Sequence, residues 1–220
     1  MRYWFTILLL AGRHLLQGQA QVDFRGLSAV NIEKMITPSL SATFMGAAIQ
    51  TYDFQETGFF WVDAGLKMDI TRRITLRGVY RLMYRRNSDN YYDRRQVLFA
   101  DLGWSRTRRS WTLGAGARLQ SSFYNHIIEG YRPPAVYSRY RASLRYKIDY
   151  YWQPFTEVEV FAPVNHPSRR GPDQFRILVG ISRTINQNFK IQLYEQWQQQ
   201  VFRGANNTNF LTALGWSIRF

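Results

Sequence analysis

The sequence predicts an all-β protein, an antiparallel up-and-down transmembrane β-barrel of 10–12 strands. Polar and apolar residues alternate with period two from residue 22 onward, as they do in strands with two different faces. The predicted strands are about 10–13 residues long, close to the roughly 9–11 residues that cross a tilted bilayer. Short and longer connections alternate along the chain, as periplasmic turns and outer loops do in membrane barrels.

Composition narrows the function classes. The chain has 220 residues, a formal net charge of +14 and no cysteine, which excludes disulfides and thiol-ligated metals. No apolar run beyond the N-terminus approaches the roughly 18 residues of a membrane-spanning helix. We do not expect nucleic acid as a partner, because the basic residues alternate into the predicted wall rather than forming one exposed stripe.

The N-terminus resembles an export signal. Arg2 precedes the apolar run 3–12, and residues 18–20 (Gly-Gln-Ala) are suited to signal peptidase. Arg13 interrupts the pattern, and a short buried strand or helix is the alternative interpretation. We therefore predict a signal peptide over 1–20 and a single barrel domain over 21–220.

Each predicted strand has its own alternating pattern. In 59–70 and 74–85, aliphatic and aromatic residues occupy one face, while Asp63, Arg77 and Arg81 lie on the other. The later segments repeat this division, and two near the N-terminus are weaker. The eleven segments are 22–34, 39–52, 59–70, 74–85, 95–105, 111–122, 138–148, 155–162, 174–183, 189–201 and 209–220.

The connections and strand ends favour a membrane wall over a soluble sheet. Aromatic residues are placed at strand ends on the apolar face, where amphipathic rings form girdles at the headgroup level; those assigned to a girdle are Tyr84, Trp104, Trp111, Tyr146 and Trp216. The short connections are 35–38, 71–73, 106–109, 149–154 and 185–188.

The last strand carries an assembly pattern. Gly215, Ile218 and Phe220 fit the terminal signal recognised by the barrel assembly machinery, although Ala213 occupies a usually polar position. We expect that machinery and outer-membrane lipid as partners, and the sequence names no other protein partner. Bacterial single-chain barrels have even strand numbers, whereas eleven segments are counted here. With the last strand ending in the periplasm, segment 22–34 would run in the same direction. We therefore expect that either one strand is missed or one of the eleven segments is not part of the wall.

Candidate chemistry is sparse. His126 and His166 lie in predicted outer loops near Ser121, Ser122 and Ser168, but nothing in the sequence orients a nucleophile toward a base. We therefore assign no catalytic residue, no metal and no cofactor. A lipid hydrolase or acyltransferase of the outer membrane, and a secreted soluble barrel that binds a small apolar ligand, remain as alternatives.

Charged residues on the polar face are the remaining functional signal. They predict either a packed interior held by charge networks or a narrow passage that favours anions. The basic residues assigned to the lumen are Arg77, Arg81, Arg85, Arg139, Arg141, Arg145 and Lys147, and the acidic ones are Asp63, Asp69, Asp101, Glu157 and Glu159.

The order of several short motifs resembles a known family. Tyr80-Arg81 is followed by 93–96 (Asp-Arg-Arg-Gln) and 117–120 (Ala-Arg-Leu-Gln), and later by 138–146, 154–161 and 175–180. In this order they resemble the outer-membrane barrel family of Bacteroidetes and relatives labelled domain of unknown function 2490. The resemblance implies an outer-membrane barrel without established activity. We thus expect a non-enzymatic protein of the bacterial outer membrane, either a small anion-favouring channel or a structural or partner-binding barrel.

Overall fold

The computed structural model describes residues 23–51, 56–86, 91–123, 134–165, 171–201 and 208–220. Among these residues, no helix is long and apolar enough to cross a membrane. They form eleven strands: β1 (Asp23–Thr37), β2 (Leu40–Thr51), β3 (Glu56–Asp69), β4 (Ile74–Arg86), β5 (Tyr92–Arg108), β6 (Trp111–Phe123), β7 (Ala135–Tyr146), β8 (Trp152–Pro163), β9 (Gln174–Thr184), β10 (Phe189–Gln200) and β11 (Thr208–Arg219).

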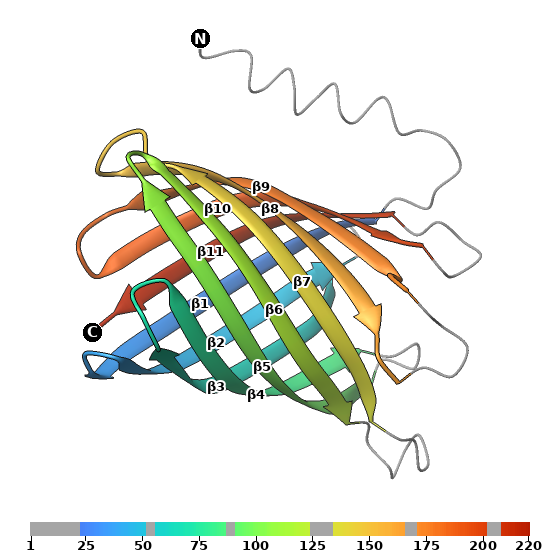
Figure 1. Ribbon diagram of the computed structural model, residues 1–220. Coiled ribbons are helices and arrows are strands. Elements are labelled where there is room, and N and C mark those ends of the chain that lie inside the picture. The colour runs from blue at the N-terminus through green and yellow to red at the C-terminus, as the bar shows by residue number, and fades with distance from the viewer. Residues whose placement is uncertain (1–22, 52–55, 87–90, 124–133, 166–170, 202–207) are drawn as a thin grey trace.

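The strands close into one barrel (Figure 1). Each strand pairs antiparallel with its neighbour in sequence, whereas β1 and β11 pair in parallel. An odd number of up-and-down strands makes the first and last run in the same direction, so the ring can close only through a parallel pair. The prediction of 10–12 strands is confirmed at eleven. The expectation of a missed strand or of a segment outside the wall was wrong for the described residues, because all eleven segments belong to the closed ring and the parallel pair accommodates the odd number.

The strand boundaries follow the alternation to within three residues. The predicted turn 35–38 was wrong, because β1 continues to Thr37 and leaves only residues 38–39 as the turn. The largest change of partner concerns β5. This strand ends at Arg108 rather than residue 105, and the turn is Arg109-Ser110 rather than 106–109. Arg109 adopts a positive φ of 53° there. The predicted end was wrong because Arg106 and Arg108 continue the outward face, and charges at these positions resemble a turn. Strand β8 likewise begins at Trp152, inside the predicted turn 149–154.

The two faces of the wall are inverted relative to a soluble barrel. Pairing registers put Asp101 and Arg118 on one side and Leu102 and Ala117 on the other. The polar side faces inward, and the apolar side is exposed, as a lipid-facing wall requires. Exposed apolar residues of this outer face include Leu66, Leu98, Leu102, Leu113, Leu119, Val179 and Leu193.

The interior is divided between an apolar and a charged sector. Beneath the β1–β11 junction, Leu27, Ala47, Leu211 and Ala213 form a buried cluster, with Tyr194 packed against it. Strands β3 to β9 contribute the charged sector, where a second buried cluster of Val79, Val97 and Phe99 lies among the arginines. The apolar cluster therefore seals the junction from within, and the charged sector contains the candidate site.

Gly180 is a point where the wall admits no side chain. A methyl group there would lie 2.4 Å from Cβ of Tyr194 and 2.6 Å from the carbonyl oxygen of Leu193, whereas one at the lipid-facing Gly78 would meet nothing within 4 Å. We expect Gly180→Ala to lower the free energy of unfolding by about 2 kcal/mol through overpacking. The matched Gly78→Ala change should leave it nearly unchanged. Denaturant unfolding of the refolded protein in lipid vesicles measures both, and equal effects would contradict the described packing.

Candidate functional site: the charged lumen

Inward-facing side chains of β4, β5 and β6 converge on Asp101. Strand register aligns Arg77, Asp101 and Arg118 on one row of the sheet. Arg77 Nη2 donates to Asp101 Oδ2 at 2.8 Å, and Arg118 Nη2 donates to the same oxygen at 2.9 Å. One carboxylate therefore holds two guanidinium groups, so this row retains a net positive charge.

Glu159 on β8 repeats the arrangement on the next strands. Glu159 is fully buried, with 0% of its surface exposed. Arg139 of β7 donates to Glu159 Oε1, and Arg176 of β9 donates to Glu159 Oε2 at 3.1 Å. Arg176 also donates to Gln198 Oε1 at 3.1 Å. A carboxylate withdrawn from water requires such partners.

Asp63 and Arg81 complete the network. Arg81 binds Asp63 through two nearly parallel hydrogen bonds of 2.7 and 2.8 Å, the geometry in which a guanidinium recognises a carboxylate best. Arg81 also lies 5.0 Å over the Trp61 ring, and Arg118 lies 3.9 Å over the Phe99 ring. We call this network the ion-pair belt; its members are Asp63, Arg77, Arg81, Asp101, Arg118, Arg139, Glu159 and Arg176.

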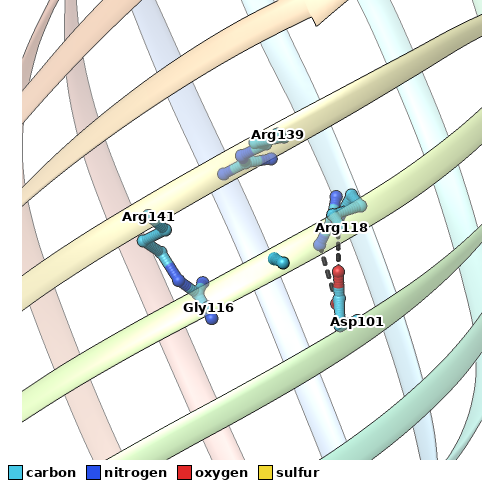
Figure 2. A pocket seen from close by; sticks show the side chains of 6 residues that line it. Asp101, Gly116, Arg118, Arg139 and Arg141 are labelled. Carbon is cyan, nitrogen blue, oxygen red and sulfur yellow. Dashed lines mark hydrogen bonds and ion pairs between the residues drawn. The ribbon is translucent and has the colours of Figure 1, made fainter. Parts of the chain in front are cut away.

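A small pocket lies within the belt. It measures about 10 Å³, room for about one water molecule, and is lined by Asp101, Gly116, Ala117, Arg118, Arg139 and Arg141. Figure 2 shows Arg118 turned toward Asp101, and Arg141 beside Gly116. A Cβ atom at Gly116 would lie 3.4 Å from Nη2 of Arg141. The glycine therefore leaves room for that guanidinium.

Toward the turns, the lumen cations are less closely paired. Arg141 lies 3.9 Å from Glu157, and 40% of its side chain is exposed although it is in the middle of an inward face. Arg145 forms no ion pair within the described part of the chain, and Lys190 donates to Gln153 Oε1 at 3.3 Å. The charges of Lys190 and Arg145 lie close enough to repel one another. This group concentrates positive potential where water reaches the lumen.

Three predicted lumen residues lie at the rims instead. Arg85 is exposed near the end of β4, with its guanidinium 5.3 Å from the centre of the Phe59 ring. Asp69 is the exposed last residue of β3, and Lys147 follows the end of β7, with Nζ 5.9 Å from the centre of the Tyr150 ring. The inward face of a strand continues to its end, where a side chain reaches solvent rather than the lumen.

The predicted girdle residues lie on the outer face near strand ends. Tyr84 stacks on Phe60 with ring centroids 4.8 Å apart, and Trp111 lies 4.6 Å from Tyr146. Trp104 pairs with Ile74 at the start of β4, and Trp216 aligns with Ile191 of β10.

The predicted assembly residues lie along β11 and just beyond its end. Gly215 aligns with Ala29 of β1, and Ile218 with Ile32. The Phe220 amide donates to the Glu33 carbonyl oxygen at 2.9 Å, while its own side chain is 67% exposed.

Several lumen cations were not among the predicted site residues. Alternation already placed Arg118 and Arg176 on polar faces, but only their contacts with Asp101 and Glu159 distinguish them. Lys67, which donates to Glu33 at 3.1 Å, and Lys190 were also missed. The sequence had already predicted the strands of these residues. A charged residue at an inward-facing position was therefore the signal that could have identified them as lumen residues.

The alternative nucleophilic site cannot be placed. His126, His166 and Ser168 lie outside the described residues, while Ser121 and Ser122 belong to β6. In the described part of the chain, no group of three His, Asp or Glu residues could hold a metal ion.

Comparisons with known proteins agree with the fold. The family described as "Protein of unknown function (DUF2490)" matches residues 4–209. A crystal structure of the NanC porin superposes with a TM-score of 0.56 at 12% identity, covering 90% of this chain and 99% of that one; at this identity the likeness shows the fold alone. The β domain of the Bordetella autotransporter BrkA gives a TM-score of 0.49 at 10% identity, with 84% and 86% of the two chains covered. No curated protein matches the sequence.

Proposed function

We propose, from the premise that this chain belongs to the DUF2490 family, that it is a non-enzymatic barrel of the bacterial outer membrane that conducts small anions. The fold supports the location, because its outer face is apolar and its inner face charged. The ion pairs that Glu157 and Glu159 form with arginines support a role without catalysis. The proposed conducting path runs past the ion-pair belt.

The observation that carries the proposal is the excess of inward cations over carboxylates. Arg141 and Arg145 retain positive charge that Glu157 alone does not match, and Asp101 and Glu159 each hold two arginines. Pores lined by basic side chains favour anions, because a mobile anion replaces part of the missing counter-charge. Water already reaches Arg141, as its 40% side-chain exposure indicates.

Bilayer conductance tests this proposal. We expect the reconstituted wild type to conduct, with a reversal potential in a KCl gradient that indicates chloride preference. The Arg141→Gln, Arg145→Gln double variant should lose most of that preference because it removes two of the three loosely paired cations. Arg81 is unsuitable for this test, since its removal would leave the buried Asp63 without its guanidinium.

The matched control removes two outward cations. Arg94 lies on the outer face of β5, and Arg183 on the outer face of β9, 5.0 Å over the Trp152 ring. Arg94→Gln, Arg183→Gln should retain wild-type selectivity. A silent bilayer, a cation preference, or equal selectivity in both double variants would overturn the channel and leave a structural or partner-binding barrel.

A further inference from the structure

Among the described residues, a charged patch outside the lumen lies at the end of the barrel that carries the short turns. Those turns are residues 38–39, 70–73, 109–110, 147–151 and 185–188, and Phe220 lies at the same end (Figure 1). Exposed cations gather over three consecutive turns there. We call them the basic rim; they are Arg72, Arg73, Arg106, Arg108, Arg109 and Lys147.

The basic rim is one continuous surface. The Ser105 amide donates to the Arg73 carbonyl oxygen at 2.8 Å, which joins the β3–β4 turn to the β5–β6 hairpin. The Lys147 amide donates to the Ser110 carbonyl oxygen at 2.8 Å and joins that hairpin to the next turn. By contrast, the turns 38–39 and 185–188 carry no charged side chain. The positive charge of the turn residues is therefore confined to one sector of the end.

Acidic residues do not neutralise this sector. Asp149, which accepts backbone hydrogen bonds from Tyr151 and Trp152 at 2.7 and 2.6 Å, contributes one negative charge against the six cations of the rim. Asp69 is the other carboxylate near the described turns of the sector. Clustered like charges repel one another, and an external anionic surface would relieve that repulsion.

Strand register places two of these cations on the lipid side of the wall. Arg106 pairs with Leu113, and Arg108 pairs with Trp111. Directly opposed residues share a face, so both arginines point outward beside exposed apolar residues. Trp111 is 49% exposed and contacts Tyr146, and Trp104 precedes Arg106 on the same face. Such rings mark the headgroup level of a bilayer, so both guanidinium groups lie where lipid phosphates are found.

We propose that the basic rim binds the phosphate groups of anionic phospholipid in the leaflet at the short-turn end. Arg106 and Arg108 reach the phosphates from the wall, and the turn cations Arg72, Arg73 and Arg109 add attraction from just beyond it. Guanidinium groups suit this contact because they donate two parallel hydrogen bonds to a phosphate. The basic rim would thereby hold one side of the barrel against anionic lipid.

Cardiolipin titration of the detergent-solubilised full chain, followed by native mass spectrometry, tests the proposal. We expect the wild type to bind cardiolipin more tightly than phosphatidylcholine, and the preference to decrease as salt increases. Arg106→Gln, Arg108→Gln should weaken cardiolipin binding by about tenfold, since each basic residue near an anionic surface adds to the attraction. Arg94→Gln, which removes an exposed outward cation at the opposite end of the barrel, should bind as the wild type does.

Two further variants distinguish an effect of charge on lipid binding from an effect on folding. Arg106→Lys, Arg108→Lys keeps the charge and should retain most of the binding. Arg72→Gln, Arg73→Gln changes only a turn, and should weaken binding even if the strand variant does not fold. Equal affinity for cardiolipin and phosphatidylcholine, or equal weakening by Arg94→Gln, would overturn the proposal. Either result would leave the proposed anion conductance standing, because that proposal rests on Arg141 and Arg145.

Discussion

Replacing Glu159 with alanine is expected to destabilise the barrel by about 3 kcal/mol, because it leaves two partly buried guanidinium groups facing one another without a counter-charge. Glu159 is fully buried and accepts hydrogen bonds from both Arg139 and Arg176. The charges of Arg118 and Arg141 also act on Arg139, so the loss adds to an existing excess of positive charge. Denaturant unfolding in lipid vesicles measures the change.

Glu157→Ala is the matched control for this prediction. Glu157 lies on the same inward face two residues earlier in β8, but its ion pair with Arg141 is long, at 3.9 Å, and 40% of the Arg141 side chain is exposed. Exposed pairs contribute little, so we expect a loss below about 1 kcal/mol. Equal losses in the two variants would show that water, rather than Glu159, satisfies the arginines of the belt.

The faces of the wall could be predicted from the sequence because side-chain direction alternates in every strand, whatever its partner. Asp101 and Arg118 were both correctly placed on polar faces for this reason. Their contact could not be predicted, since it depends on register. A turn centred on 106–109 would align Arg118 with Val97, whereas the turn at Arg109-Ser110 aligns it with Asp101. A shift by an even number of residues preserves the face and changes the partner.

The closure of the barrel is a second feature that the alternation of residues could not predict. The pattern gave eleven segments, but the parallel pairing of β1 with β11 joins residues 186 positions apart, such as Leu27 and Ala213. No local pattern encodes such a contact. The buried cluster of Leu27, Ala47, Leu211 and Ala213 suggests its cause, because these residues lack the charges of the other inward faces and exclude water together.

Ala213→Asp is the second change with a large expected effect. Ala213 is 1% exposed within the apolar cluster, so an aspartate there would be withdrawn from water without a partner. We expect the folded barrel to lose about 3 kcal/mol or more, the usual consequence of an unpaired buried polar group. Denaturant unfolding and the yield of refolded protein measure this loss.

Ser217→Asp provides the control on the same face of β11. Ser217 is directly opposite Lys190 of β10, so the new carboxylate would meet a cation and should be tolerated. If Ala213→Asp were tolerated equally well, the interior beneath the junction would have to be wet. The β1–β11 pair would then not close the barrel as described.

A direct measurement of the junction is available because the chain has no cysteine. Leu27 and Ala213 are paired in the parallel register, and their side chains share the inward face. Neighbouring strands bring paired residues within the Cα separation that a disulfide spans, so the Leu27→Cys, Ala213→Cys variant should form a crosslink on oxidation. Leu27→Cys, Ser217→Cys, displaced by four residues along β11, should not. A crosslink in the displaced pair alone would require a different register, and no crosslink in either folded variant would favour an open junction over a closed eleven-stranded ring.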